Sequence, residues 1–258
     1  MPESDTFRKS DQNAPPALFA TEAAGLEWLA AAQGARVARV IAHNATSLEI
    51  ERITSGNADR AKASAFGTAL AATHAAGAPN FGAKPPHAPG PHGFIGPTGS
   101  PLPMAYGEWS CWGDFFAEAR LLPYLRMARD HGSITAADSQ TIERVAARLT
   151  AGDFNDDLTP ARIHGDLWSG NLLWSRDEAV LIDPAAHGGH PLDDLAMLGV
   201  FSAPFIEDIY TGYEQHRALP DEWRQRLPLH QLYPLLVHAV LFGDSYGTAA
   251  ARIARRFI

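Results

Sequence analysis

Three side chains near the middle of the sequence have the types and the spacing that phosphoryl transfer requires. Asp166 lies in the run His164-Gly165-Asp166, Asn171 follows it by five residues, and Asp183 follows it by seventeen. A carboxylate can accept or orient the proton of an attacking hydroxyl, while an amide and a second carboxylate can hold Mg²⁺ on nucleotide phosphates. The spacing therefore predicts Asp166 as the catalytic base and Asn171 and Asp183 as the magnesium ligands.

The sequence between Asn171 and Asp183 predicts a β-hairpin that would bring these groups together. Residues 172–174 and 179–182 form short apolar runs, and the polar residues 175–178 between them are typical of a turn. A hairpin would return Asp183 to the edge that carries Asn171, beside Asp166. A His-Gly-Asp triplet alone is more typical of a loop between strands, and only the complete set at these spacings favours phosphoryl transfer.

The composition indicates a folded protein and argues against several classes of partner. The 258 residues are 46% hydrophobic and carry a net charge of -8, so we expect a globular protein that does not bind nucleic acid. Cys111 is the only cysteine, which excludes an intrachain disulfide and is consistent with a reducing cytoplasm. The sequence has no apolar run as long as a membrane span and no signal-peptide apolar segment. We therefore expect a cytoplasmic protein that makes no membrane contact.

Apolar periodicity predicts an α+β fold with two lobes and the site between them. Residues 1–54 would form a small, mixed nucleotide-binding lobe, and residues 55–258 a larger, mostly helical catalytic and substrate lobe. Strands are predicted at 6–9, 36–42 and 47–53, and helices at 21–32, 61–76, 112–131, 138–149, 192–201, 206–216 and 229–242.

Residues 77–107 differ from the rest of the chain. This segment of 31 residues contains eight prolines and seven glycines, which is too many for regular structure. Because it also carries several large apolar side chains, we expect an ordered, functional loop that wraps over the surface.

A nucleotide site also needs a cation for the phosphates, and Lys9 with Glu22 is the candidate pair. Lys9 would place its charge on the phosphate oxygens, and Glu22 would hold the ammonium in place. Taken alone, the same residues could be an exposed tail lysine and a glutamate favourable to a helix dipole. The strand that ends at Glu51, Arg52 and Ile53 would meet an adenine through its backbone N–H and C=O groups.

Four further residues near these motifs are candidates for support or substrate contact. Asp194 is predicted to be structural and to bond the backbone of the catalytic loop, rather than to be a third metal ligand. Trp168 could stack on a sugar ring or pack beneath the loop. His187 and His190 flank two glycines, which suggests a flexible pocket wall; a zinc site is less favoured, because no cysteine or compact ligand quartet accompanies them.

Taken together, these motifs resemble the fructosamine (ketosamine) 3-kinase family, relatives of the aminoglycoside phosphotransferases with a protein-kinase-like fold. The resemblance implies that Asp166 is the base, Asn171 and Asp183 hold magnesium, and Lys9 and Glu22 clamp the phosphates of ATP. We further predict Trp168, His187 and Trp112 as substrate contacts and His164 and Asp194 as structural support. The resemblance covers most of the chain and is carried by residues 7–9, 22–26, 112–121, 164–171, 183–185, 194–197 and 241–243.

The sequence departs from the family pattern in two places. The family normally has two strands joined by a Gly-rich loop ahead of the lysine, whereas this chain begins almost at Lys9 and residues 1–8 contain no glycine. The resemblance therefore implies a shortened N-terminal lobe without backbone N–H groups roofing the phosphates. In addition, residues 190–193 stand where many members carry an Arg-Glu pair.

The leading hypothesis is ATP- and Mg²⁺-dependent phosphorylation of a ketosamine, which the resemblance places on the 3-hydroxyl of the sugar. The sugar could be ribulose, erythrulose or fructose, and the amine that carries it could belong to a protein side chain or to a metabolite. Any oligomeric state is compatible with the sequence. A second hypothesis is an aminoglycoside-type or other small-molecule phosphotransferase. A third is a nucleotide-binding pseudokinase without turnover, against which the joint presence of Lys9, Glu22, Asp166, Asn171 and Asp183 speaks.

Overall fold

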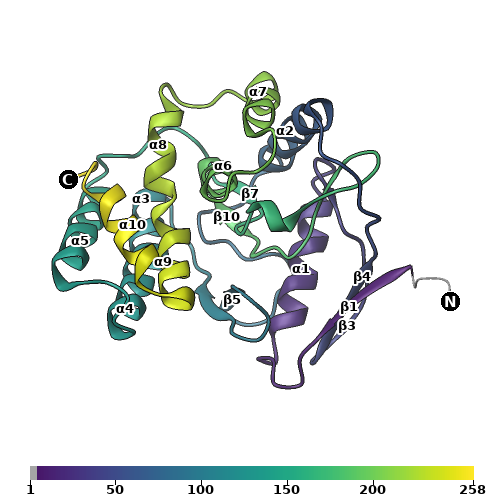
Figure 1. Cartoon of the computed structure of the whole chain (residues 1–258), viewed down its shortest axis with the longest axis horizontal. Helices are drawn as coiled ribbons and strands as arrows, with labels where there is room; N and C mark the ends of the chain where they lie inside the picture. The colour runs from purple at the N-terminus through teal and green to yellow at the C-terminus, as the bar shows by residue number, and fades with distance from the viewer. Residues whose placement is uncertain (1–4) are drawn as a thin grey trace.

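In the computed structural model of the protein, which describes residues 5–258, a small antiparallel sheet lies at one end of the molecule (Figure 1). Its strands are β1 (Thr6–Ser10), β4 (Ser47–Glu51) and β3 (Val40–Asn44), in the order β1-β4-β3. Alternation along the central strand β4 buries Leu48 and Ile50. Helix α1 (Leu18–Ala30) packs against this sheet and begins three residues before the predicted start.

The predicted hairpin after the catalytic motif is confirmed. Strand β8 (Leu172–Trp174) pairs antiparallel with β9 (Ala179–Leu181), and the 3-10 turn η2 (Ser169–Asn171) leads into it. Strand β2 (Arg36–Val37) pairs parallel with β9, so the N-terminal part of the chain is hydrogen-bonded to the hairpin that carries the site. A second small sheet joins β7 (Ala161–Ile163) to β10 (His187–Gly189).

Helix α2 (Arg60–Ala75) begins at an N-cap, where the Asp59 side chain accepts a hydrogen bond from Lys62 N. It packs tightly on α7 (Ile206–His216). Gly67 and Gly212 allow this approach, because a Cβ at either position would overlap the backbone of the facing helix. Helix α6 (Pro191–Val200) packs beside α7 and starts with a capping box formed by His190 and Asp193.

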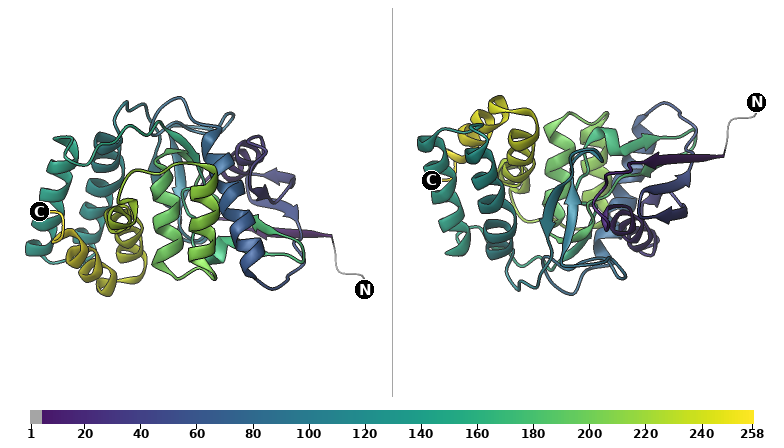
Figure 2. Two further views of the ribbon diagram at one scale, coloured as in Figure 1. Left: turned by 90° about the horizontal axis from the view of Figure 1, so that it is seen from above. Right: turned by 90° about the horizontal axis from the view of Figure 1, so that it is seen from below.

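The prediction that residues 77–107 lack regular structure is wrong. The segment contains an antiparallel hairpin of β5 (His92–Ile95) and β6 (Leu102–Ala105). Proline cannot donate to a strand ladder, but a two-stranded hairpin leaves one edge of each strand unpaired and so tolerates Pro103 opposite Phe94. Burial of Ile95 and Met104 anchors the hairpin in the middle of the molecule (Figures 1 and 2).

Helices fill the other end of the molecule, as Figure 2 shows. The predicted helix at 112–131 is present but changes its winding: α3 (Trp112–Phe115) passes into a π-helical turn η1 (Phe116–Leu121) and then α4 (Leu122–Asp130). The others are α5 (Ala136–Thr150), α8 (Trp223–His230), α9 (Leu232–Phe242) and α10 (Asp244–Ala254).

Two of these helices were not predicted. Helix α8 carries polar residues and Pro228, so it lacks a clear apolar stripe. Helix α10 buries a face at helical spacing, but this face consists of Gly247, Ala250, Ala251 and Ala254, whose small side chains give a weak apolar pattern. The predicted helix at 229–242 accordingly begins later, at Leu232.

Two hydrophobic cores hold the fold together. The first joins α1 and β4 to α2, α6 and α7, so it includes residues from both predicted lobes. The second lies among α3, η1, α4, α5, α9 and α10. The architecture is the predicted α+β type, and no described helix is long and apolar enough to cross a membrane.

Candidate active site

A cavity of about 260 Å³ lies where α1, the β5–β6 hairpin, the catalytic loop and α9 meet. Its polar lining consists chiefly of the predicted groups, which come from four separate parts of the chain. Apolar side chains from the hairpin tip and α9 line the rest. The predicted residues that line it are Lys9, Glu22, Asp166, Trp168, Asn171 and Asp183.

The backbone of the catalytic loop is held by the buried carboxylate of Asp194. Its two oxygens accept hydrogen bonds from His164 N at 2.7 Å and Gly165 N at 2.9 Å. These bonds support the structural role predicted for Asp194. Burial raises the pKa of this carboxyl, but the hydrogen bond from His74 and, to a smaller extent, that from Gly165 N outweigh the burial and leave the pKa lowered. Gly165 is required here, since its φ is +80° and a side chain would overlap Ala185 O.

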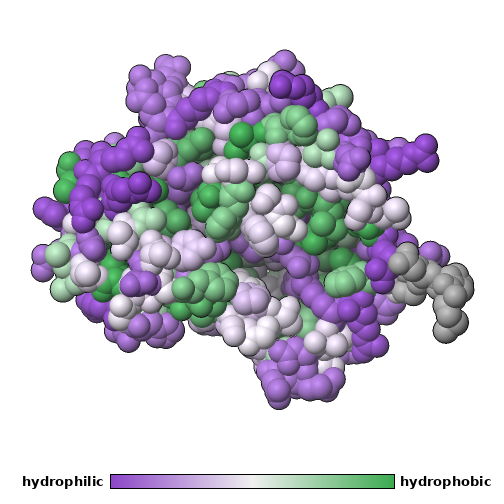
Figure 3. Space-filling model, in the orientation of Figure 1, coloured by the Kyte–Doolittle hydropathy of each residue, from purple (hydrophilic) through white to green (hydrophobic). Residues whose placement is uncertain are grey.

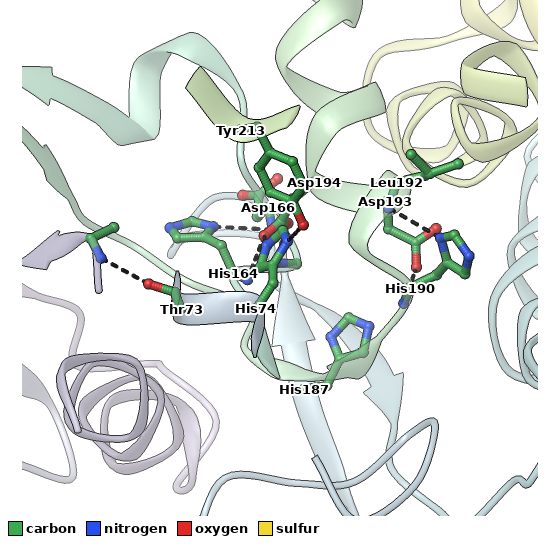
Figure 4. A network of polar contacts seen from close by, with 12 residues as sticks. Thr73, His74, His164, Asp166, His187, His190, Leu192, Asp193, Asp194 and Tyr213 are labelled. Atoms are coloured by element: carbon green, nitrogen blue, oxygen red, sulfur yellow. Dashed lines mark hydrogen bonds and ion pairs between the residues drawn. The ribbon is translucent and has the colours of Figure 1, made fainter. Parts of the chain in front are cut away.

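Two histidines extend this support network (Figure 4). His74 donates from Nε2 to Asp194 Oδ2 at 3.1 Å, and its Nδ1 accepts from the Tyr213 hydroxyl at 2.8 Å. His164 donates from Nε2 to Ile182 O at 2.8 Å, and its Nδ1 accepts from Asp166 N at 3.2 Å. These bonds support the structural role predicted for His164, whose ring ties the catalytic loop to the residue that precedes Asp183.

Asn171 connects the catalytic carboxylate to the second acidic residue. Its Nδ2 donates to Asp166 O at 2.9 Å, to Asp166 Oδ2 at 3.1 Å and to Asp183 O at 3.4 Å. Asp183 itself has a left-handed backbone with φ of +53°, a conformation that costs energy in a non-glycine residue and is enriched at functional sites. The structure thus brings the three predicted groups together.

Lys9 lies between two carboxylates at one end of the cavity. Its Nζ is 2.5 Å from Glu22 Oε1 and 3.1 Å from Asp183 Oδ1. Burial lowers the pKa of Lys9, but the attraction of Glu22 and Asp183 outweighs it and leaves that pKa raised. The sequence alone left open whether Lys9 and Glu22 were a pair, and the structure places them in contact.

Two carboxylates in the cavity hold their protons unusually tightly. Burial raises the pKa of Asp166 to about 7, opposed by the hydrogen bond from Asn171 and reinforced by the charges of Asp183 and Asp194. Burial also raises the pKa of Glu22 to about 7, opposed by the attraction of Lys9. A carboxylate that titrates near neutral pH is suited to exchange a proton with a substrate hydroxyl.

The donor set at Asn171 and Asp183 fits Mg²⁺. The side-chain hydrogen bonds that the structure gives Asn171 all come from Nδ2, which leaves Oδ1 as an oxygen donor, and the Asp183 side chain is 41% exposed. Magnesium prefers oxygen ligands and is usually held by one or two protein groups, with phosphates and waters completing its shell. Within residues 5–258 no three His, Cys, Asp or Glu side chains cluster as a metal cage, in keeping with that mode.

The strand predicted to face an adenine does not line this cavity. The Glu51 carboxylate binds Arg36 Nη2 at 2.9 Å and Arg39 N at 3.0 Å. Arg52 N donates to Asp5 O, and Ile53 packs against the first core. The role of residues 51–53 in holding adenine therefore stays a prediction.

His187 and Trp112 lie away from the cavity, contrary to the expectation of a substrate contact. His187 is buried in β10, donates from Nδ1 to Ala185 O at 2.8 Å and packs on Phe115, so the expected flexible wall is a paired strand. Trp112 is buried and stacks on His230 with ring centroids 4.3 Å apart. The glycines beside His187, and the position of Trp112 near a family motif, were not enough to tell a core residue from one that lines the cavity.

Trp168 does line the cavity, with 38% of its surface exposed and its ring edge-on to Phe201 at 5.9 Å. Sequence reasoning missed most of the apolar lining, which comes from the hairpin tip and from α9. Residues 241–243 had been matched only as part of a motif, with no role attached. The missed lining residues are Leu18, Thr21, Phe94–Thr98, Pro184, Ala185, Val237, His238, Leu241 and Phe242.

Comparisons with known proteins agree with this geometry. The family model described as fructosamine kinase matches residues 2–258. A probable ketoamine kinase of Synechocystis is 34% identical over 260 residues, covering 98% of this chain and 83% of that protein. The crystal structure of a protein described as a putative fructosamine-3-kinase from Thermobifida fusca is 43% identical in sequence with a TM-score of 0.88, covering 97% of this chain and 85% of that one.

More distant structures share the fold alone. A choline/ethanolamine kinase family protein of Mesorhizobium loti is 16% identical with a TM-score of 0.59, over 98% of this chain and 82% of that one. This likeness shows the kinase-like fold. The family match over nearly the whole chain, with the ketoamine kinase relative and the Thermobifida structure, shows that this protein is a phosphotransferase that belongs to the fructosamine kinase family.

Proposed function

We propose that this protein transfers the γ-phosphoryl group of MgATP to a sugar hydroxyl of a ketosamine, the 3-hydroxyl by family resemblance. The observation that carries the proposal is the meeting of Asp166, Asn171, Asp183 and the Lys9–Glu22 pair at one cavity. The adenine would lie between residues 1–54 and the rest of the chain, near residues 51–53. A cytoplasmic location, where ATP is abundant, is part of the same proposal.

The residues of the chain would divide the work by position. Asp166 would accept or orient the proton of the hydroxyl that attacks, and Asn171 would keep that carboxylate in place through its Nδ2 hydrogen bond. Lys9, held by Glu22, would bind phosphate oxygens, and Asn171 Oδ1 and Asp183 would hold Mg²⁺. When bound, ATP supplies the phosphoryl group and Mg²⁺ neutralises its charge. Little covalent chemistry is then required of the protein beyond orienting the two reactants.

The protein must also exclude water from the transferred group, since water would compete with the sugar as acceptor. The apolar side chains that the hairpin tip and α9 contribute to the same cavity as Asp166 support this role. Trp168, exposed at the same cavity, offers a ring face on which a sugar can stack.

The test is ATP consumption with Mg²⁺ on a panel of ribulosamine, erythrulosamine, fructosamine and aminoglycoside acceptors, with products identified by mass. We expect the mass of one phosphate to be added to at least one ketosamine. Phosphorylation of aminoglycosides alone would replace the proposal with the antibiotic-type activity. Nucleotide binding without transfer to any acceptor would point to a pseudokinase.

A further inference from the structure

We infer that the outer end of the cavity is a subsite for an uncharged hydrocarbon arm on the amine of the acceptor, with Phe242 as its specificity-determining residue. The inference rests on the proposed function and specifies which ketosamines the site prefers. It arises from the apolar part of the cavity lining, which supplies no group that would bind phosphate or magnesium or exchange a proton with the substrate.

An aromatic surface borders this end of the cavity. Phe242 lines it with 60% of its surface exposed, an unusual state for a phenylalanine. The His238 ring supports it at a centroid distance of 5.4 Å and also contacts Phe201 at 4.9 Å and Tyr246 at 5.1 Å. Figure 3 shows apolar residues bordering the hollow on this face of the molecule. Such a patch beside a cavity is typical of a binding surface.

Two elements meet at this surface, the helix α9 and the tip of the β5–β6 hairpin. Val237, His238, Leu241 and Phe242 recur at helical spacing, so they form one stripe of α9. The tip of the β5–β6 hairpin faces this stripe: a Cβ on Gly96 would lie 3.0 Å from Leu241 Cδ1. The hairpin tip and α9 therefore form one continuous apolar surface, on which a chain of methylenes packs better than a hydrated polar group.

The polar groups of the cavity dictate which end of the acceptor lies here. Lys9, Asp183, Asn171 and Asp166 are joined by hydrogen bonds and ion pairs, so the phosphate and the reacting hydroxyl must lie among them. The sugar is the polar part of a ketosamine and must reach Asp166. Its amine substituent therefore points away from these groups, toward the apolar end.

The charges at this end exclude an anionic arm. Lys9 is the one lysine or arginine among the described residues that line the cavity, and it is paired with Glu22 and Asp183. His238 does not replace it, because burial lowers the pKa of that imidazole and keeps it neutral at pH 7. Asp244, which follows Phe242 closely in the chain, is exposed and acidic. A carboxylate on the arm would lose part of its hydration here, and no unpaired lysine or arginine among the described lining residues would compensate for that loss.

The experiment measures kcat/KM for ketosamines of one sugar made from methylamine, butylamine, hexylamine and 4-aminobutyrate. We expect kcat/KM to rise about tenfold from the methyl to the hexyl adduct, since each methylene contributes part of its full transfer free energy at a half-exposed surface. The 4-aminobutyrate adduct should be about fivefold poorer than the butyl adduct.

Two variants and one control assign the effect to the surface. Phe242→Ala should lower the hexyl-to-methyl ratio to about twofold or less, and Phe242→Arg should reverse the discrimination against 4-aminobutyrate. Phe205→Ala removes an aromatic side chain that is 39% exposed but does not line the cavity, so the ratio should stay at its wild-type value. A flat series in the wild type, or an unchanged ratio in Phe242→Ala, would overturn the inference. No turnover of any adduct, methyl included, would instead contradict the proposed function.

Discussion

At the scale of single residues, the site is defined by three carboxylates that share one cavity with one ammonium. Asp183 and Glu22 both contact Lys9, while Asp166 is held by the amide of Asn171. Crowding of like charges in a partly buried site is unfavourable for the free protein. Substrate, metal and nucleotide would relieve it, so we expect the residues of this site to trade stability for activity.

The titration of Asp166 should make the free energy of unfolding depend on pH. Its pKa is raised to about 7 in the folded protein, whereas an unfolded carboxyl titrates near its ordinary value of about 3.9. The folded state therefore binds more protons between about pH 4 and pH 7, and stability falls as pH rises through that window. Asp166→Asn should be more stable than wild type at pH 8 by on the order of 1 kcal/mol, with the gap closing toward pH 4.

Urea unfolding of the two proteins at several pH values measures that gap. A difference that stays constant from pH 4 to pH 8 would show that packing or hydrogen bonding, rather than proton binding, separates the variants. Protonation of Asp166 below its pKa should also lower kcat/KM as the medium becomes more acidic.

Lys9 should prove necessary for both nucleotide binding and stability. Lys9→Met leaves Glu22 and Asp183 without their shared partner, and loss of one member of a buried pair costs about 3 kcal/mol. Adding Glu22→Gln removes one of the unpaired charges, so the double variant should recover part of the stability. Nucleotide affinity, measured by calorimetry, should stay at least about tenfold weaker in both variants. Recovery of affinity in the double variant would mean that Lys9 serves folding alone.

Prediction at the residue scale succeeded where the signal was local. Asp166, Asn171 and Asp183 lie within eighteen residues of one another, and a short hairpin suffices to bring them together. His238 and Phe242 lie far along the chain in an apolar helix, and no spacing rule distinguishes a cavity-lining apolar residue from a core one. For the same reason Trp112, which is buried in the second core, was assigned to the substrate.

At the scale of elements, the catalytic loop is rigid because several elements hold its backbone. Asp194 in α6 binds the loop amides, His74 in α2 binds Asp194, and Tyr213 in α7 binds His74. The close packing of α2 on α7 at Gly67 and Gly212 holds that arrangement. The site is thus supported by helices that contribute no residue to the reaction.

Gly170 controls the position of Trp168 within the loop. A Cβ at residue 170 would overlap the Trp168 ring, so Gly170→Ala must displace it. If the ring stacks on the acceptor, KM for the ketosamine should rise about tenfold, a loss in the range for an aromatic contact, with little change in KM for ATP. Gly99→Ala is the matched control, because a Cβ there meets no atom within 4 Å. Equal effects on both KM values would show that the substitution disturbs the whole loop.

Whether a helix or strand could be predicted depended on the amino-acid composition of its segment rather than on the length of the segment. The hairpin at residues 172–181 has apolar strands and a polar turn and was predicted, whereas the β5–β6 hairpin was hidden by its prolines. Long-range packing stabilises those strands, since Phe94 and Ile95 pack onto the cores formed by the rest of the chain. Helix α8 contains Pro228 and was missed because local propensity opposes the tertiary structure.

At the scale of the whole molecule, the site lies where the two hydrophobic cores meet. Residues of the first core supply Leu18 beside Glu22, and residues of the second supply Ile95, Ala185 and Val237. The cavity is therefore assembled only when both cores are formed. The family, and with it the kinase-like fold, could be predicted from the motifs. The first core contains residues from both predicted lobes, so the two cores do not mark a boundary at residue 54, and that boundary stays a prediction.

The measurement that tests the central claim most directly compares wild type with Asp166→Asn on a ribulosamine and MgATP. The account predicts that phosphate transfer falls about a thousandfold in the variant, as expected when a positioned base is removed, while nucleotide affinity by calorimetry changes less than about threefold. Because Asp166→Asn should be at least as stable as wild type at pH 8, unfolding would not explain the loss. A variant that retains a tenth or more of the wild-type rate would contradict the assignment of Asp166 and with it the mechanism proposed for this cavity.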